Sequence, residues 1–539
     1  MLQQIQQNIK TQPAGADGKP GTRLTPSQAK AGTVTVRVER FEFQGNTLLS
    51  AEQLNEVLAP WLQRDLDYAE LRKLTTVVSA AYREAGWMAS VSLPRQEIRE
   101  GLVQLQIVEA KFGKTVVQGD QNRVDPQWLE AYVAQAQTPG EPVSSKRIDR
   151  ALLLLDEVPG LKVSGNFVAG SEAGLTDLTL DAGERAPVTG SVTVDNTGAR
   201  STGTERVVGT LSVHSPLGLG DQLGVTALKT QGSAYQRVGF SVPVGYDGWR
   251  LGANTSRMTY GLVGEFKSLD SNGSADSQGL DVSYPLVRSQ QTNVRLTGSY
   301  DAKHFDNNAH GASASNYRIG VWNIGLNASQ NDAWQGGGTN TLTLGVAQGH
   351  SNLNGSANQT ADTSGPATAG SFRKFNLGLN RQHNITSTLT AYVAVNIQRA
   401  NKNLDSSERL YLGGANGIRA YPGSEGGGSE GQVFTAELRQ KLNEQTQFSG
   451  FYEHGHVQAF KNQAWADGSG RLNAGTAPND VTLKGYGVTL SHKPLPSTEL
   501  RATWARRIGS NPLANTSTGA DGDGTHTLNR LWLNATFSF

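Results

Sequence analysis

The sequence has 539 residues, enough for two to four domains of about 150 residues each. Its 48 Lys and Arg residues are balanced by 47 Asp and Glu residues, which argues against a nucleic-acid-binding protein. The chain has no cysteine, which excludes a disulfide scaffold, a thiolate metal site and a cysteine nucleophile. No apolar run approaches the roughly 18 residues of a transmembrane helix.

Residues 1–33 differ in composition from the rest of the chain. Leu2, Ile5 and Ile9 are spaced to line one face of a short helix, which we expect over residues 1–12. Residues 13–33 are rich in Gly, Pro, Ala, Ser and Thr and predict a flexible linker, which spans up to about 70 Å when extended. Because so short a helix is marginal in water, we expect it to need a docking site.

Residues 34–112 and 113–185 are predicted to form two similar α+β units, each ordered strand, helix, helix, strand, strand. In the first unit, Ser50 is a plausible N-cap of the first helix, and Gly86 ends a second helix over 68–85. The remaining predicted elements are strands over 34–43, 88–93, 102–108, 115–118, 161–168 and 175–181, and helices over 126–136 and 144–156.

Residues 186–539 are predicted to be strands that follow one another to the end of the sequence. In the clearest example Leu531, Leu533, Ala535 and Phe537 share one face, while polar residues share the other. Short turns such as 246–248 alternate with long polar loops over 354–371, 461–480 and 509–525. This asymmetry is typical of a transmembrane β-barrel between lipid and a wet lumen, and the length predicts about 16 strands. A soluble β-sandwich also alternates, but some 350 residues of strands without a helix is long for one sandwich.

Several stretches resemble the two-partner secretion transporters of bacterial outer membranes. The helix-containing units resemble POTRA domains, and two of them ahead of a barrel are similar to this family's organisation. Four further stretches resemble family patterns: 194–198 in the first barrel strand, 215–223, Ser283-Tyr284-Pro285-Leu286, and 412–421. The resemblance covers essentially the whole chain. It implies a transmembrane antiparallel β-barrel preceded by two α+β POTRA domains and an N-terminal plug helix.

The resemblance also implies a loop around 411–431 that folds into the barrel. Its tip is Ile418, Arg419, Ala420 and Tyr421, where the family usually has Val-Arg-Gly-Tyr or Val-Arg-Gly-Phe. Ala420 in place of Gly leaves the tip geometry open, because Ala disfavours a positive φ. The partner strand carries Phe451, Glu453 and Gly455, with Glu in place of the usual Asp; the three share one face, which the family pairing points into the lumen. A bidentate contact between Arg419 and Glu453 is the expected pairing; the alternative is two unrelated polar lumen residues.

Three other signals favour structural interpretations. Gly427-x-Ser429-x-Gly431 matches a nucleophile elbow only formally, because it lies in a glycine-rich hairpin rather than a strand–turn–helix. His454 and His456 share a strand face without an evident third metal ligand. The tryptophans at 249, 322, 504 and 532 fit an interfacial aromatic girdle or strand packing. We therefore expect no catalytic site, no cofactor and no metal.

The expected function is export of a large secreted partner, such as an adhesin, a haemolysin or a contact-dependent toxin. The POTRA domains would lie in the periplasm and capture the unfolded partner by strand addition to an exposed sheet edge. POTRA topology implies edge strands over 88–93 and 161–168. Their candidate residues are Met88, Val91, Leu93, Leu161, Val163 and Phe167.

At rest, the helix over 1–12 would plug the pore together with the inward loop. Two alternatives remain within outer-membrane barrels. One is a protein assembly and insertion factor of the same superfamily, against which the count of two POTRA units argues. The other is a passive porin, which needs no periplasmic interaction domains.

Overall fold

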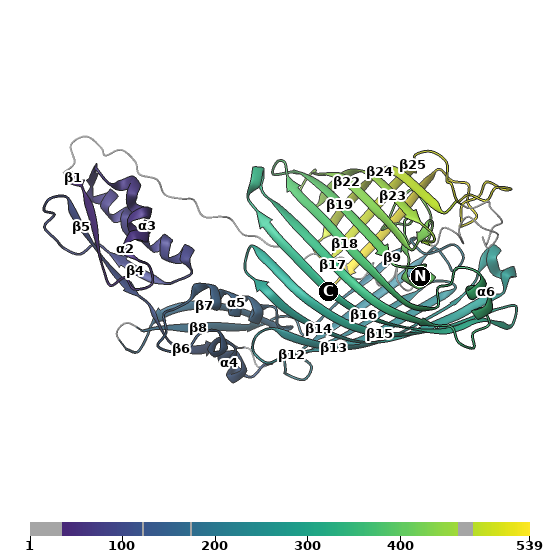
Figure 1. Ribbon diagram of the computed structural model, residues 1–539, viewed down its shortest axis with the longest axis horizontal. Helices are drawn as coiled ribbons and strands as arrows, with labels where there is room; N and C mark the ends of the chain where they lie inside the picture. The colour runs from purple at the N-terminus through teal and green to yellow at the C-terminus, as the bar shows by residue number, and fades with distance from the viewer. Residues whose placement is uncertain (1–34, 121–122, 173–174, 462–477) are drawn as a thin grey trace.

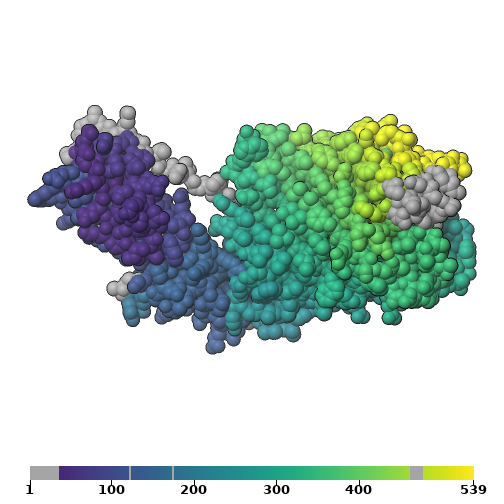
Figure 2. Space-filling model, in the orientation of Figure 1, coloured from purple at the N-terminus to yellow at the C-terminus, as the bar shows by residue number. Residues whose placement is uncertain are grey.

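The computed structural model describes residues 35–120, 123–172, 175–461 and 478–539. Two small α+β domains lie at one end of a β-barrel, and the second domain lies between the first domain and the barrel (Figures 1 and 2). The predicted helix over 1–12 and the linker over 13–33 fall outside the described residues. No helix among the described residues is long and apolar enough to cross a membrane.

The first domain packs two helices against a small mixed sheet. Strand β2 pairs in parallel with β5, and β5 pairs antiparallel with β4, in the order β2-β5-β4. Leu54, Leu58, Leu74, Val78 and Tyr82 project from the helices into the core and are fully buried. The elements are β1 (Thr35–Val38), β2 (Arg40–Gln44), α2 (Ala51–Leu58), η1 (Ala59–Trp61), β3 (Arg64–Asp67), α3 (Tyr68–Ala85), β4 (Ala89–Ser92) and β5 (Leu102–Glu109).

The single strand predicted over 34–43 is wrong, because the chain breaks at Glu39. The backbone amides of Glu39 and Arg40 both donate to the carbonyl of Gly101, at 2.9 and 3.3 Å. This shared acceptor interrupts the ladder, so β1 turns away and pairs with β3, a strand that the sequence did not predict. The predicted helix ends are confirmed: Ser50 caps α2 in a capping box, and Gly86 adopts φ 94° after α3.

The second domain repeats the plan with a sheet in the order β6-β8-β7. Helices α4 and α5 cover one face of this sheet, and Leu129, Val133, Ile148 and Leu155 are fully buried between them and the strands. Among the described residues, β7 pairs only with β8, so its other edge is unpaired. The elements are β6 (Lys111–Gln118), α4 (Pro126–Ala136), α5 (Ser145–Asp156), β7 (Leu161–Ala169) and β8 (Leu175–Glu184).

The rest of the chain closes into an antiparallel barrel, and the prediction of about 16 strands is confirmed. Each strand pairs with its neighbours in sequence, except that β19 pairs directly with β22 and β26 closes on β9. The strands are β9 (Val188–Asp195), β10 (Arg206–His214), β11 (Gln222–Lys229), β12 (Ser233–Val244), β13 (Trp249–Gly261), β14 (Ser271–Arg288), β15 (Thr292–Ala309), β16 (Ala312–Asp332), β17 (Gly338–Asn352), β18 (Gly370–Asn384), β19 (Leu389–Ala400), β22 (Glu430–Lys441), β23 (Thr446–Gln458), β24 (Asp480–Leu495), β25 (Thr498–Arg507) and β26 (Asn529–Ser538).

The closing seam between β9 and β26 has a short ladder of five residue pairs, from Asn534↔Asp195 to Ser538↔Ser191. Gly190 and Phe539 extend it by exchanging two backbone hydrogen bonds of 2.9 and 3.0 Å. The side chain of Asn196 adds two more, to the carbonyl of Leu531 and the amide of Leu533. The seam therefore relies on one polar side chain where the backbone ladder ends.

The barrel wall is apolar on its outer face and polar on much of its inner face. Leu280, Trp322 and Ile324 point outward and are more than 60% exposed. Residues of the opposite parity point into the lumen, among them Thr489 and Thr503, whose hydroxyls lie 2.9 Å apart. An outer surface of this kind is stable only in contact with hydrocarbon.

Candidate functional site

The segment between β19 and β22 does not belong to the barrel wall. Because β19 and β22 pair directly, residues 401–429 leave the wall and fold against its inner face. A short hairpin of β20 (Leu410–Tyr411) and β21 (Gly427–Gly428) forms the base of the loop over 412–426. The amide of Ile418 donates to the carbonyl of Leu412 at 2.7 Å, which folds the loop tightly onto itself. We call residues 412–426 the inward loop.

Arg419 at the tip of the inward loop is held by two carboxylates of the wall. Glu453 on β23 accepts from the Arg419 backbone amide at 2.7 Å and from its Nε at 2.6 Å. Glu437 on β22 accepts from Nη2 at 2.6 Å. The side chains of Arg419 and Glu453 are 14% and 2% exposed, so this contact is largely shielded from water. The wall thus binds both the main chain and the side chain of the tip.

The structure brings Arg419 and Glu453 together with a geometry that differs from the expected one. Glu453 does not receive two guanidinium nitrogens; one of its oxygens binds the backbone amide, and the guanidinium is shared with Glu437. Sequence reasoning missed Glu437. The signal that could have found it is strand alternation, which places Glu437 and Arg439 on the same face of one strand, beside each other. In the structure Arg439 donates to Glu437 at 2.8 Å.

Aromatic side chains complete the surroundings of Arg419. The guanidinium carbon lies 3.4 Å from the centroid of the Phe451 ring, within range of a cation–π interaction. Trp532 on β26 donates its indole N–H to the Arg419 carbonyl at 2.8 Å. Trp532 therefore points into the lumen, so of the two interpretations offered for the tryptophans, aromatic girdle or packing on the strands, the girdle does not apply to it. Trp249, Trp322 and Trp504 point outward.

A floor of glycines lets the inward loop approach the wall closely. A Cβ at Gly455 would lie 2.6 Å from the Ile418 side chain, and a Cβ at Gly485 would lie 2.7 Å from that of Ala420. Ala420 is 1% exposed and is not among the described non-glycine residues with positive φ. Ala420 therefore fits without backbone strain, since its φ is not positive. Its methyl group fills the space above Gly485.

Apolar side chains of the inward loop and the wall form a small core inside the lumen. This core explains why the tip residues Ile418 and Tyr421 are buried although the loop lies in a largely polar lumen. Burial of this kind adds a non-directional contribution to the ionic contact at Arg419. The cluster comprises Leu412, Ile418, Ala420, Tyr421, Val433, Phe451, Val457, Val481, Leu483 and Ala505.

The far side of the inward loop is tied to the connection between β25 and β26. Glu425 is 5% exposed and accepts from the Asn511 amide at 2.8 Å and from the backbone amide of Gly522 at 3.1 Å. Asp521 in the same connection pairs with Arg507 of β25 at 2.8 Å. The inward loop is therefore fixed at its tip by the wall and, at Glu425, by the connection between β25 and β26, which lies at the same end of the barrel as the connection between β19 and β22.

A second ionic contact holds the segment that leads into the inward loop. Glu408, 2% exposed, lies 2.7 Å from the ammonium groups of both Lys303 on β15 and Lys374 on β18. This triad could not be predicted from the sequence, because its members are up to 105 residues apart.

Below the inward loop the lumen contains a cavity of about 710 Å³. Charged pairs at Arg206–Asp195 and Glu499–Arg501 lie among its lining. Hydroxyl-bearing side chains are the largest group in the remaining lining, mainly on strands β9, β11 and β23 to β26. These residues include Thr193, Thr226, Ser449, Thr489, Ser491, Thr503, Thr536 and Ser538. Such a lining offers many hydrogen-bonding groups and little apolar surface.

The predicted edge strands lie at sheet edges. Strand β4 holds Val91 and is flanked by Met88 and Leu93, and β7 holds Leu161, Val163 and Phe167. Leu161 and Val163 are buried in the domain core, so any contact with a partner would use the backbone rather than these side chains. The Val163 amide donates to Asp156 at 3.0 Å, so it points away from β8. By strand alternation, the amides of Gly165 and Phe167 have the same direction.

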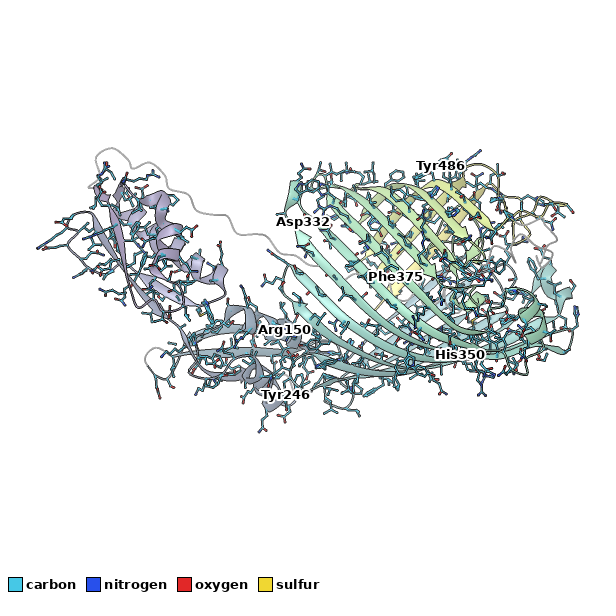
Figure 3. The ribbon with its side chains drawn as sticks, in the orientation of Figure 1. Arg150, Tyr246, Asp332, His350, Phe375 and Tyr486 are labelled. Carbon is cyan, nitrogen blue, oxygen red and sulfur yellow. The ribbon has the colours of Figure 1, made fainter. Side chains whose placement is uncertain are left out.

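The second domain is joined to the barrel through helix α5. Arg150 pairs with Asp247 of the β12–β13 turn at 2.5 Å and donates to the Pro285 carbonyl at 2.9 Å. Arg150 and Tyr246 mark this joint in Figure 3. Asp247 also accepts from the Tyr284 hydroxyl at 2.6 Å, and Glu157 pairs with Arg295 at 2.8 Å. The stretches around 215 and 283–286 therefore contribute to the joint, since Ser215 also donates to the Pro159 carbonyl.

The residues of the nucleophile-elbow match and of the histidine pair make ordinary structural contacts. The Ser429 hydroxyl accepts from the Leu404 amide and donates to the Ala459 carbonyl, at 3.0 and 3.1 Å. His456 lies 3.6 Å from Asp480 and His454 lies on the same face. No group of three His, Cys, Asp or Glu residues suited to a metal is found in the part of the chain that the structure describes.

Comparison with known proteins gives two family matches. Residues 174–477 match the haemolysin secretion/activation proteins ShlB/FhaC/HecB, and residues 36–110 match the ShlB-type POTRA domain. The chain is 23% identical over 481 residues to the heme/hemopexin transporter protein HuxB of Haemophilus influenzae, covering 87% of this chain and 82% of that protein. It is 25% identical over 414 residues to the outer membrane transporter CdiB of Dickeya dadantii, covering 74% and 72%.

Two solved structures have the same fold. CdiB from Escherichia coli aligns with a TM-score of 0.70 at 19% identity, over 100% of this chain and 98% of that one. BamA from Haemophilus ducreyi, without its POTRA domains 1–3, aligns with a TM-score of 0.57 at 14% identity, over 94% and 100%. The expected fold, a POTRA-bearing barrel of 16 strands, is therefore confirmed.

Proposed function

The chain belongs to the family of haemolysin secretion/activation proteins ShlB/FhaC/HecB, and on this premise we propose that it exports a large secreted partner protein through its barrel lumen. It lies in the bacterial outer membrane with its POTRA domains in the periplasm. The observation that carries the proposal is the inward loop, held against the inner wall by Arg419, Glu453 and Glu437 beside a polar cavity. A fixed loop in a wet lumen suits a pore that must open for one class of cargo.

The contact of Arg419 with Glu453 and Glu437 supports the proposal that the inward loop is a gate, which opens when this contact breaks. A shielded pair gains its strength from fixed geometry, and removing one partner leaves a charge without compensation. Arg419 is held through its side chain and its main chain, so the tip has one well-defined seat. We propose that incoming cargo passes along the hydroxyl-lined side of the cavity, where backbone groups of an extended chain find sequence-independent partners.

We further propose that the POTRA domains capture the cargo before it folds. The unpaired edge of β7 supports this, because the outward amides of Gly165 and Phe167 match the spacing of an added strand, whereas the Val163 amide is already bonded to Asp156. The joint at Arg150 and Asp247 would hold that edge at one end of the barrel. Strands β4 and β7 are the proposed capture edges, and residues 1–12 remain the proposed plug.

The cargo class is proposed from the names of the relatives. These are a heme/hemopexin transporter, a CdiB transporter and, at 21% identity over half of this chain, a hemolysin transporter protein of Proteus mirabilis. They favour a large secreted adhesin, haemolysin or contact-dependent toxin. The family is one of transporters, so we propose no catalytic role. Folding of the cargo outside the cell would give export its direction.

Site-specific crosslinking during export tests the capture step, and the absence of native cysteine makes it clean. Asn166 on β7 is exposed and is the position chosen for a cysteine. Single cysteines are then placed one by one along the amino-terminal segment of a secreted partner encoded beside this gene. Asn166→Cys is expected to form disulfides with the cysteines at every second position of that segment. Gln135→Cys on exposed α4 is the matched control and should not crosslink. Equal crosslinking at both positions would contradict capture at the edge.

Export itself is tested by measuring the same partner in the growth medium. Cells with the intact chain should release the partner into the medium. Cells that produce the chain without residues 34–185 should retain the partner in the periplasm. Unchanged release would contradict a role for the POTRA domains. A general loss of other outer-membrane barrels in the deletion strain, with partner release intact, would instead indicate the assembly-factor alternative.

A further inference from the structure

The outer wall of the barrel carries an open groove of about 470 Å³ across strands β16 to β19. Its floor is a row of aliphatic residues in register: Ala328 faces Leu342, Leu342 faces Leu379, and Leu379 faces Val395. Leu379 is 45% exposed, so the row points away from the lumen. The groove therefore lies on the lipid-facing side of the wall.

A charged pair lies at one end of this groove. Arg381 on β18 pairs with Asp332 on β16 through two nitrogens, at 2.7 and 3.2 Å. Asn340 on β17 links them, accepting from Arg381 and donating to Asp332 at 2.7 Å each. The side chains of Arg381 and Asp332 are 28% and 25% exposed. The pair is thus pre-organised and still reachable from outside.

The pair lies at the level where lipid headgroups are expected. Asp332 ends β16 at the end of the barrel that faces the POTRA domains, and Phe375 lies farther along the same wall (Figure 3). Trp334 in the adjoining turn is 60% exposed, lies 5.3 Å from the Arg381 guanidinium and packs on His383. An exposed tryptophan beside charges is typical of a membrane–water interface, where outward charges cost least.

We propose that this groove binds one zwitterionic aminophospholipid of the periplasmic leaflet. An acyl chain lies over the aliphatic row, and the headgroup lies against the Arg381–Asp332 pair. The charges match in number and sign: the phosphate meets the guanidinium and the ammonium meets the carboxylate. An anionic headgroup would bring its surplus charge against Asp332. The proposal concerns the lipid-facing wall and does not depend on which partner is exported.

Lipid retention by the full-length protein tests the proposal. The detergent-purified chain is titrated with phosphatidylethanolamine or phosphatidylglycerol, and bound lipid is counted by native mass spectrometry. One phosphatidylethanolamine should remain bound, with at least a tenfold preference over phosphatidylglycerol. Arg381→Ala should lower its retention at least tenfold. Equal retention by the variant, or equal binding of phosphatidylglycerol, would overturn the proposal.

Two further variants separate binding from folding. Arg257→Ala is the matched control, because Arg257 also points outward and lies 3.8 Å from Asp276 on a different part of the wall; its lipid retention should equal that of the unmodified chain. Ala328→Trp fills the groove without touching the charged pair and should also release the lipid. Heat-modifiable electrophoretic mobility reports whether each variant is a closed barrel. A folded Ala328→Trp protein that keeps its lipid would overturn the acyl-chain site.

Discussion

The POTRA domains and the barrel stabilise themselves in opposite ways. In the first POTRA domain, fully buried residues such as Leu74 and Val78 are apolar, and the charged side chains are mostly exposed. In the barrel, Leu280 and Ile324 are exposed to the outside, and deeply buried charges such as Glu408 and Glu453 lie in the lumen. The same polypeptide chemistry thus yields a domain held by apolar packing and a barrel held by its backbone ladder, with ion pairs buried inside the lumen. The difference indicates where substitutions should affect stability and where they should affect gating.

The largest expected effect is that of Arg419→Ala in the lumen. It leaves Glu453 and Glu437 shielded from water without their shared cation, a change that costs about 3–5 kcal/mol for a buried pair. The inward loop should leave its seat, and export of the partner should fall to background while single-channel conductance in planar bilayers rises. The barrel should still migrate as a folded, heat-modifiable band.

Arg439→Ala is the matched control, because Arg439 contacts Glu437 but not the inward loop. Conductance and export should stay close to those of the unmodified chain. Wild-type export by the Arg419→Ala variant would show that the ion pairs of Arg419 have no role in gating.

A smaller but clear effect is expected from Leu74→Ala in the first POTRA domain. Leu74 is fully buried, and removing such a side chain typically costs about 2–5 kcal/mol. Hydrogen exchange of the full-length protein should show faster exchange in α3 and β5 with no change in the barrel. Leu280→Ala on the outer wall leaves no internal cavity, so its effect should be smaller; equal losses would remove the contrast between the two regions.

The smallest effect concerns a carboxylate that accepts several hydrogen bonds within the first POTRA domain. Burial alone raises the pKa of Glu109, but hydrogen bonds from Thr47, Leu48 and Tyr82 outweigh it and hold that pKa below its usual value. The Leu48 amide and the Tyr82 hydroxyl donate at 2.7 and 2.9 Å. A lowered pKa contributes stability that is present above the unfolded value, about 4.5, and is lost as the pH falls through the folded value.

Glu109→Gln should therefore destabilise the first POTRA domain by about 1–3 kcal/mol at pH 7 and by less at pH 3. Hydrogen exchange of α2 and β5 at both pH values measures the difference. If Glu109→Gln lowered the free energy of unfolding equally at pH 7 and pH 3, the negative charge of Glu109 would not contribute to these hydrogen bonds.

The fold could be predicted far more fully than the site. Period-two alternation and helix caps at Ser50 and Gly86 are local signals, so the barrel and the POTRA helices followed from the sequence. The strand break at Glu39 depended on a carbonyl at Gly101, which no local pattern reveals. Arg419 and Glu453 were found through family motifs rather than physics.

Other parts of the site could not be read from the chain at all. The contact between Trp532 and the Arg419 carbonyl joins residues 113 positions apart, and Arg150 meets Asp247 across 97 positions. The alternation of the last strand places Trp532 on its polar face, but nothing in the neighbourhood of Trp532 or Arg150 identifies the residue that it contacts. Only the closed barrel brings such pairs together.

The seam between β9 and β26 sets the order in which this protein can mature. Thr193 and Thr536 share a hydrogen bond across 343 positions, so the first wall strand waits for its neighbour until nearly all of the barrel has been made. Until then β9 presents an open edge that invites aggregation, and contacts so distant in sequence form slowly. The edge of β9 therefore needs protection until the barrel closes, and the five-pair junction is where an error of register would first appear.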